Sequence, residues 1–156
     1  MRLALIAVGR LRDGPERDLV DDYLDRAGRL ARAHGFSGPV EAEVEPRRAS
    51  GPAAEAEAIG RALEPGMGLV CLDERGRTLS SPDFAARLRD WRDAGRRSAG
   101  VVIGGADGLD AGLRGRADLV LSFGPMVWPH MLARVMAAEQ LYRAMSILAG
   151  TPYHRG

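Results

Sequence analysis

Residues 100–109 read GVVIGGADGL, an apolar run that passes directly into a glycine-rich segment. The run 100–103 is short, apolar and rich in β-branched side chains, which is typical of a buried strand. Gly104, Gly105 and Gly108 leave the backbone open at the end of that strand, so that a ligand can approach it closely. The spacing differs from GxGxxG, and a chain without lysine cannot form a P-loop. By itself the segment therefore fits a tight turn as well as a ligand-binding loop.

Strands and helices are predicted to alternate along the rest of the chain. Further strands are expected at residues 2–8, 40–44, 68–72 and 117–122, with a polar turn at 73–79. Helices are expected at 15–34, from a Ser50 cap to about 64, from Ser81 to about 97, in a short piece from 110, and at 129–149. This order predicts an α/β fold with a mainly parallel sheet of about five strands and helices on both faces. Ligands of such sheets bind beyond the carboxyl ends of the strands, which points to the loops after Leu72, Ile103 and Ser122.

The bulk composition fits a single domain, residues 1–156, without membrane attachment. No apolar run is long enough to cross a bilayer, and the N-terminus lacks a small-residue cleavage site, so a cytoplasmic protein is expected. The single cysteine, Cys71, lies in an apolar run and is expected to be a buried thiol. Three scattered histidines offer no metal-ligand spacing, so no metal is expected. With a net charge of only +1, any contact with RNA must come from a local patch.

The last third of the chain holds the segments that could carry chemistry. The stretch 121–134, LSFGPMVWPHMLAR, is apolar where a surface loop would be polar, so the protein itself or a partner subunit is expected to cover it. The helix that follows places His130 and Arg134 one turn apart, and Glu139 with Arg143 as an ion pair. The tail 151–156, TPYHRG, combines groups that stack on bases and bind phosphate, although a terminus of this length is commonly frayed.

Four segments together resemble one family: AVGR at 7–10, LDERGR at 72–77, IGGADGL at 103–109 and PHMLARVMAAEQLYRAMSILAGTPYH at 129–154. They resemble the RlmH (YbeA) family of pseudouridine N3-methyltransferases, in the SPOUT superfamily, over essentially the whole chain. The resemblance implies an alpha/beta-knot fold with a C-terminal trefoil knot, which ordinary topology rules would have rejected. It also implies S-adenosyl-L-methionine as cofactor, an obligate homodimer, and 23S ribosomal RNA, in the large subunit or the assembled ribosome, as substrate.

The resemblance further implies the site residues. The cofactor pocket is expected to be lined by Leu72, Asp73, Gly104, Gly105, Gly124, Pro125, Met126, Val127, Trp128 and Pro129. RNA contacts are expected from Arg143, Tyr153, His154 and Arg155, and help with methyl transfer from His154, Arg155 and His130. The family's loop pattern is SLSxLTLPH, whereas this chain reads LSFGPMVWPH, in which Val127 replaces a hydroxyl residue. Cofactor contacts in this loop are therefore expected mainly from the backbone.

The implied reaction is one in-line displacement, which needs neither an enzyme nucleophile nor a metal. We expect a bulky residue at Gly105 to block the pocket, a second copy to cover the 123–128 loop and the last helix, and the tail to fold back over the cofactor loops. One alternative is a non-catalytic SPOUT-fold RNA-binding or ribosome-assembly factor, which calorimetry with the cofactor would distinguish. Another is a flavodoxin-like or nucleotide-binding enzyme, for which a co-purifying flavin or nucleotide would be the sign.

Overall fold

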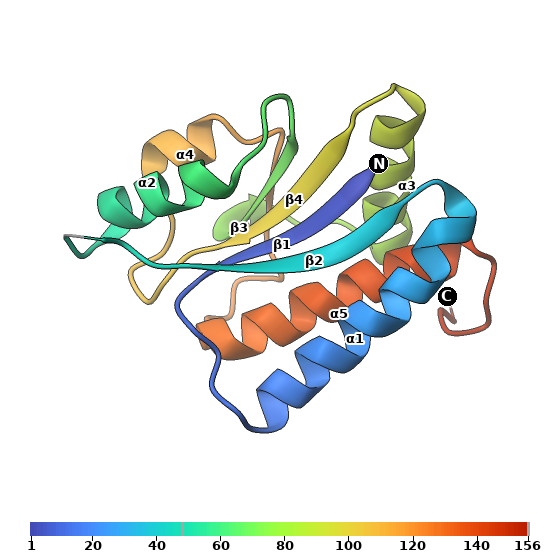
Figure 1. Cartoon of the computed structure of the whole chain (residues 1–156), viewed down its shortest axis with the longest axis horizontal. Helices are drawn as coiled ribbons and strands as arrows, with labels where there is room; N and C mark the ends of the chain where they lie inside the picture. The colour runs from blue at the N-terminus through green and yellow to red at the C-terminus, as the bar shows by residue number, and fades with distance from the viewer. Residues whose placement is uncertain (48, 156) are drawn as a thin grey trace.

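The computed structural model describes residues 1–47 and 49–155; Arg48, and Gly156 of the predicted tail 151–156, lie outside the described residues. Strands and helices alternate as predicted (Figure 1). The elements are β1 (Arg2–Val8), α1 (Pro15–Ala31), η1 (Arg32–His34), β2 (Ser37–Val44), α2 (Pro52–Ala62), β3 (Gly68–Arg77), α3 (Ser81–Asp93), β4 (Ser98–Ile103), α4 (Ala111–Gly115), β5 (Leu119–Leu121) and α5 (His130–Leu148).

The five strands form one sheet in the order β2-β1-β4-β3-β5, and every neighbouring pair is parallel. This confirms the α/β class and the parallel sheet. β1 lies inside the sheet, where Leu5 pairs with Glu41 of β2 on one side and with Val101 of β4 on the other. The trefoil knot stays a prediction, because the order of the strands does not describe how the chain is threaded.

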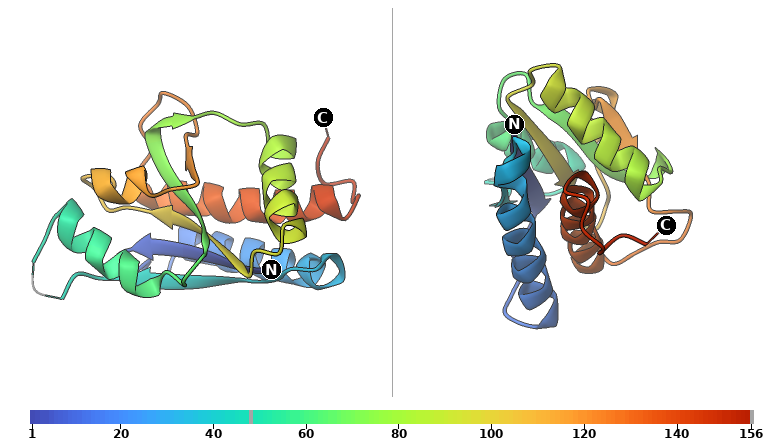
Figure 2. Two further views of the ribbon diagram at one scale, coloured as in Figure 1. Left: turned by 90° about the horizontal axis from the view of Figure 1, so that it is seen from above. Right: turned by 90° about the vertical axis from the view of Figure 1, so that its right-hand side faces the viewer.

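Successive side chains of the strands point to opposite faces of the sheet, and helices cover both. Leu3 and Leu5 of β1 belong to a core formed with α1, α3 and α5. Ile6 of the same strand belongs to a second core, which includes Ile59 of α2 and Leu113 of α4. Figure 2 shows the same arrangement from two further sides. Helices on both faces are thereby confirmed, and the inner strands β1 and β4 are nearly continuous apolar runs because both of their faces are covered.

The first and last helices lie side by side along one face of the sheet (Figures 1 and 2). α1 buries Val20, Leu24 and Ala27, whose spacing of four and three residues places them on one side of the helix. α5 contributes several buried alanines, which allow the two helix backbones to approach closely. Pro129 precedes the first turn of α5 and Gly150, at φ 67°, follows its end, as predicted.

The prediction of a polar turn at 73–79 was wrong. β3 stops pairing with β4 at Leu72 but continues to Arg77, which pairs with Leu121 of β5 and accepts a hydrogen bond from the amide of Ser122 at 3.0 Å. The two chains approach so closely that a Cβ at Gly76 would lie 2.6 Å from the carbonyl oxygen of Val120. The segment appears turn-like in the sequence because several of its charged side chains are exposed to solvent.

Several element ends also differ from the predictions. β2 begins at Ser37 rather than at 40, because an edge strand tolerates the missing amide of Pro39. Gly51, not Ser50, is the N-cap of α2, and it provides no side-chain hydrogen bond. α3 ends at Asp93 rather than near 97, ahead of Gly95 at φ 82°. Among the described residues no helix combines the length and apolar character that a membrane span requires.

Candidate functional site

Residues 72–75 of β3, beyond its pairing with β4, the carboxyl end of β4 and the loop after β5 enclose a cavity of about 420 Å³, here called the strand-end cavity. Its position is the one expected for a parallel sheet. Nine of the residues predicted for the site line it: Leu72, Asp73, Gly104, Gly105, Gly124, Met126, Val127, Trp128 and His130. Pro125 and Pro129, predicted with them, are not among the lining residues. The structure thus brings together the three loops to which both the predicted parallel sheet and the resemblance had pointed.

One wall of the cavity is apolar and another is acidic. Phe123 and residues 126–128 of the loop after β5, the apolar loop, present hydrophobic side chains to the cavity. Glu74 and Asp107 line the same cavity and are exposed. The side chain of Asp73 is only 5% exposed: its carboxylate accepts from the amide of Arg75, which also lines the cavity, at 2.9 Å and from Arg114, which does not, at 3.3 Å. Such a site suits a ligand with a flat apolar part and a positive charge.

Residues 104–108, the glycine loop, form a narrow turn at the end of β4. The amide of Gly108 donates to the carbonyl of Gly105 at 3.1 Å, and Gly108 adopts φ 78°. A Cβ at Gly104 would lie 3.0 Å from the backbone of Gly108, so the turn closes only around a glycine. A Cβ at Gly105 would instead meet the Glu55 carboxylate, at 2.5 Å, and Glu55 does not line the cavity. The first atom of a side chain at Gly105 would thus point toward Glu55; that a bulky residue there blocks the pocket stays a prediction.

Cys71 precedes this site on β3 and is fully buried, as predicted. Burial, and secondarily the negative charge of Asp73, raises the pKa of its thiol to about 11. The thiol therefore stays protonated at neutral pH and is not a nucleophile. Within residues 1–47 and 49–155 no group of histidine, cysteine and acidic side chains is placed to hold a metal ion.

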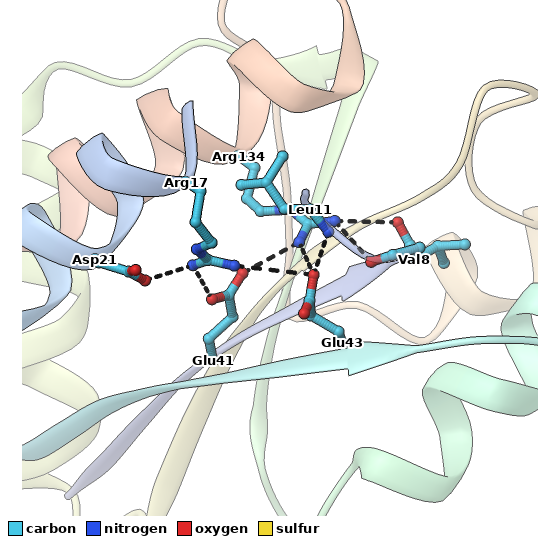
Figure 3. Close-up of polar contacts among 8 residues, drawn as sticks. Val8, Leu11, Arg17, Asp21, Glu41, Glu43 and Arg134 are labelled. Carbon is cyan, nitrogen blue, oxygen red and sulfur yellow. Dashed lines mark hydrogen bonds and ion pairs between the residues drawn. The ribbon is translucent and has the colours of Figure 1, made fainter. Parts of the chain in front are cut away.

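A buried ion-pair cluster, which the sequence did not reveal, holds the first turns of α5 against the sheet (Figure 3). Arg134 is 2% exposed and donates to Glu41 at 3.1 Å and Glu43 at 2.7 Å. Its other nitrogen donates to the carbonyls of Val8 and Gly9 at 3.2 and 2.9 Å. The cluster thus joins the end of β1, strand β2 and α5. From the alternating acidic residues of 40–44 the sequence analysis predicted a strand but not this cluster, because Arg134, the partner of Glu41 and Glu43, lies far along the chain.

The predicted RNA-contacting residues gather elsewhere, beside α1 and the middle of α5. Arg143 pairs with Glu139 at 2.6 Å, as predicted, and lies 3.3 Å from the His154 ring. The hydroxyl of Tyr153 donates to Glu139 at 2.9 Å, and its ring lies 4.5 Å from that of Tyr142. A separate surface cavity between α1 and residues 151–155 is lined by Tyr153 and Arg155.

The tail does not fold back over the cofactor loops of its own chain, so that expectation was wrong. None of the tail residues described lines the strand-end cavity, and the tail lies at the other end of α5 from the apolar loop (Figures 1 and 2). The reason is the packing of Tyr153 on Tyr142, which draws the tail toward α1. Of the three predicted catalytic residues, the cavity of a single chain contains only His130.

Comparison with known proteins agrees with this architecture. A family model described as predicted SPOUT methyltransferase matches residues 1–154. The chain is 64% identical to ribosomal RNA large subunit methyltransferase H of Cereibacter sphaeroides (strain ATCC 17025 / ATH 2.4.3) and 60% identical to the protein of the same name from Paracoccus denitrificans (strain Pd 1222), each over 99% of both chains. The crystal structure of a probable methyltransferase from Bordetella pertussis Tohama I shares the fold, with a TM-score of 0.51 at 19% identity over 92% of this chain and 96% of that one.

A parallel sheet with a glycine-lined cavity at its strand ends, together with the family model, defines a SPOUT methyltransferase. Identity of about 60% over the full length of both chains also shows the family within this class. The chain belongs to the ribosomal RNA large subunit methyltransferase H family.

Proposed function

We propose that the protein transfers the methyl group of S-adenosyl-L-methionine to N3 of a pseudouridine in 23S ribosomal RNA. The names of its relatives state methylation of large-subunit ribosomal RNA. The observation that carries the proposal for this chain is the strand-end cavity, where residues 72–75 of β3, the glycine loop and the apolar loop converge. Work on ribosomal RNA would place the protein in the cytoplasm.

The residues of the cavity fit this cofactor. A volume of about 420 Å³ lies within the range of about 300–1,000 Å³ that is usual for small-molecule sites. The side chains of Met126 and Trp128 offer apolar surface for an adenine ring, and glycine backbone amides and carbonyls can approach its edge. The carboxylates of Glu74 and Asp107 complement a positively charged sulfonium.

When bound, the cofactor supplies an electrophilic methyl group. The task of the chain is to hold donor and acceptor in line, since a single displacement at carbon gains most from positioning. His130 is the first residue of α5 and lines the cavity, so it can hold the acceptor base or take up the N3 proton. The buried Arg134 cluster fixes the helix turn that carries His130.

The active unit is proposed to be a homodimer. Five large apolar side chains form an exposed run from the apolar loop into α5, with Met126 and Val127 at 70% and 82%: Met126, Val127, Trp128, Met131 and Leu132. A run of this kind favours a self-complementary contact between two copies. Since the tail of one chain cannot reach its own cavity, we propose that His154 and Arg155 of one subunit serve the cavity of the other.

Trp128 offers a direct test of the cofactor site. The chain has two tryptophans, of which Trp91 is buried in the core and Trp128 lines the cavity. In a Trp91→Phe variant, titration with S-adenosylmethionine should change the fluorescence of Trp128. The Kd from this titration should equal the Kd from calorimetry. The matched Trp128→Phe variant should show no change. Cofactor binding without a response from Trp128 would refute the location.

Activity and subunit cooperation need a second experiment. Ribosomal RNA from a strain lacking the gene should be methylated at N3 of a pseudouridine by the purified protein, as mapped by mass spectrometry. A tail-deleted subunit (without residues 153–156) and a Gly104→Val subunit should each be inactive, whereas their mixed dimer should regain activity. A mixture as inactive as its parents would show that the tail does not act across subunits.

A further inference from the structure

The amide of Gly105, at the start of the glycine loop, donates a hydrogen bond of 3.1 Å to the carboxylate of Glu55. Glu55 belongs to the first turn of α2, on the other core of the sheet, and does not line the strand-end cavity. The resemblance assigned it no role, and the alanines on either side of it in the sequence give no sign of one. The contact joins residues 50 positions apart.

The opposite end of the same loop is also held by a charged side chain from outside the cavity. Arg114 of α4 donates to the carbonyl of Leu109 and, at 3.3 Å, to Asp73 of β3. Between these two anchors the loop makes its own hydrogen bond from Gly108 to Gly105. Glu55 thus fixes the first residue of the turn, and Arg114 fixes the chain just after it.

The clearance at Gly105 shows how tightly Glu55 is seated. A Cβ at this position would lie 2.5 Å from one carboxylate oxygen and 3.0 Å from the carboxylate carbon. Glycine at 105 therefore makes room for Glu55, whereas glycine at 104 makes room for the turn itself. Displacing the carboxylate would therefore release Gly105, the first residue of the turn, from its anchor on α2.

We propose that Glu55 is a positioning residue for the cofactor, holding the glycine loop in the shape that binds it; this inference rests on the proposed function of the cavity. A loop that adopts its binding shape for only a fraction of the time binds with an affinity reduced by that fraction. Loss of one hydrogen bond to a charged group should leave roughly a tenth of the molecules competent, so Kd should rise about tenfold.

Two variants and one matched control test this. Glu55→Ala should raise the Kd for S-adenosylmethionine, by calorimetry and by Trp128 fluorescence in the Trp91→Phe background, by about tenfold. Glu55→Gln keeps an oxygen that accepts from Gly105 and should restore affinity to within about twofold. Glu57→Ala removes the same charge from the same helix. The Glu57 carboxylate is 79% exposed and pairs with Arg61, so this variant should bind S-adenosylmethionine with the Kd of the wild type.

Steady-state kinetics separates positioning from a general loss of structure. Glu55→Ala should raise KM for the cofactor and leave both KM for ribosomal RNA and kcat at saturating cofactor near the wild-type values. An unchanged cofactor Kd in Glu55→Ala, or equal losses in Glu55→Ala and Glu57→Ala, would overturn the proposal. A failure of Gln to restore binding would do the same. Absence of any Trp128 response in the Trp91→Phe protein itself would instead refute the cofactor site.

Discussion

The guanidinium of Arg134 donates to the carboxylate of Glu43 at 2.7 Å, although the two residues are 91 positions apart. Arg17 of α1 approaches the same acidic pair and binds Glu41 and Asp21 (Figure 3). One buried and one half-buried guanidinium and their carboxylates therefore tie α1, α5 and β2 together at the strand end nearest the cavity. A buried pair is costly to break, because the remaining charge is left without a partner.

Replacing Arg134 by methionine should strongly destabilise the protein. The change leaves Glu41 and Glu43 without this cation and two carbonyl oxygens without a donor. The free energy of unfolding in urea should fall by about 3–5 kcal/mol. Arg29→Met is the control, since Arg29 is 76% exposed and paired only on the surface, and should change it by less than about 1 kcal/mol. Similar small effects of both substitutions would contradict the role of the cluster.

Stability should decline in acid partly through Glu43. Burial alone would raise its pKa, but hydrogen bonds from the amide of Leu11 and from Arg134 outweigh burial and lower the pKa below the ordinary value of 4.5. A carboxylate with a lowered pKa stabilises the fold fully above the pKa of the unfolded chain, and this contribution is lost as the pH falls through the folded pKa. Urea midpoints of Glu43→Gln, measured from pH 7 to pH 3, should therefore decline less below about pH 4.5 than those of the wild type. Parallel curves would exclude Glu43 as a source of the acid loss.

Gly76→Ala should weaken the contact between β3 and β5. Its Cβ would lie 2.6 Å from the carbonyl oxygen of Val120, and backbone on both sides would have to move. We expect a loss of about 1–3 kcal/mol in the free energy of unfolding. Gly60→Ala is the matched control: it lies inside α2 with nothing within 4 Å of the new Cβ, and should stabilise the protein by about 0.4–1 kcal/mol. Equal effects of the two substitutions would count against the close approach at Gly76.

Tyr153 should act as the anchor of the tail. Its ring packs on Tyr142, and burial, followed by the hydrogen bond to Glu139, raises the pKa of its phenol, so the hydroxyl remains a donor. Tyr153→Ala should expose the tail to carboxypeptidase and lower methylation, whereas Tyr153→Phe, which keeps the ring packing, should resist the protease nearly as well as the wild type. Digestion is followed by mass spectrometry. If the Ala variant resists carboxypeptidase as well as the wild type does, the tail is held by other contacts.

The parts predicted from the sequence are those with local signals. The run 100–103 and the glycines after it predict β4 and its turn, and Pro129 and Gly150 predict the two ends of α5. The interactions that were missed join distant segments: Glu55 to Gly105 and Arg134 to Glu43. Nothing in the neighbourhood of an acidic residue on a strand or helix tells which cation or amide it will meet. The path of β3 was missed for a related reason, since Arg77 pairs with β5, a strand that comes much later in the chain.

The packing of α1 against α5 also determines when the newly made chain can fold. The buried side of α1, with Val20 and Leu24, shares its core with Leu141 and Met145 of the last helix. A nascent chain can complete a core only from the segments already synthesised. The N-terminal helix can pack on β1 early, but part of its apolar side must stay uncovered until residues 130–148 have left the peptide exit tunnel.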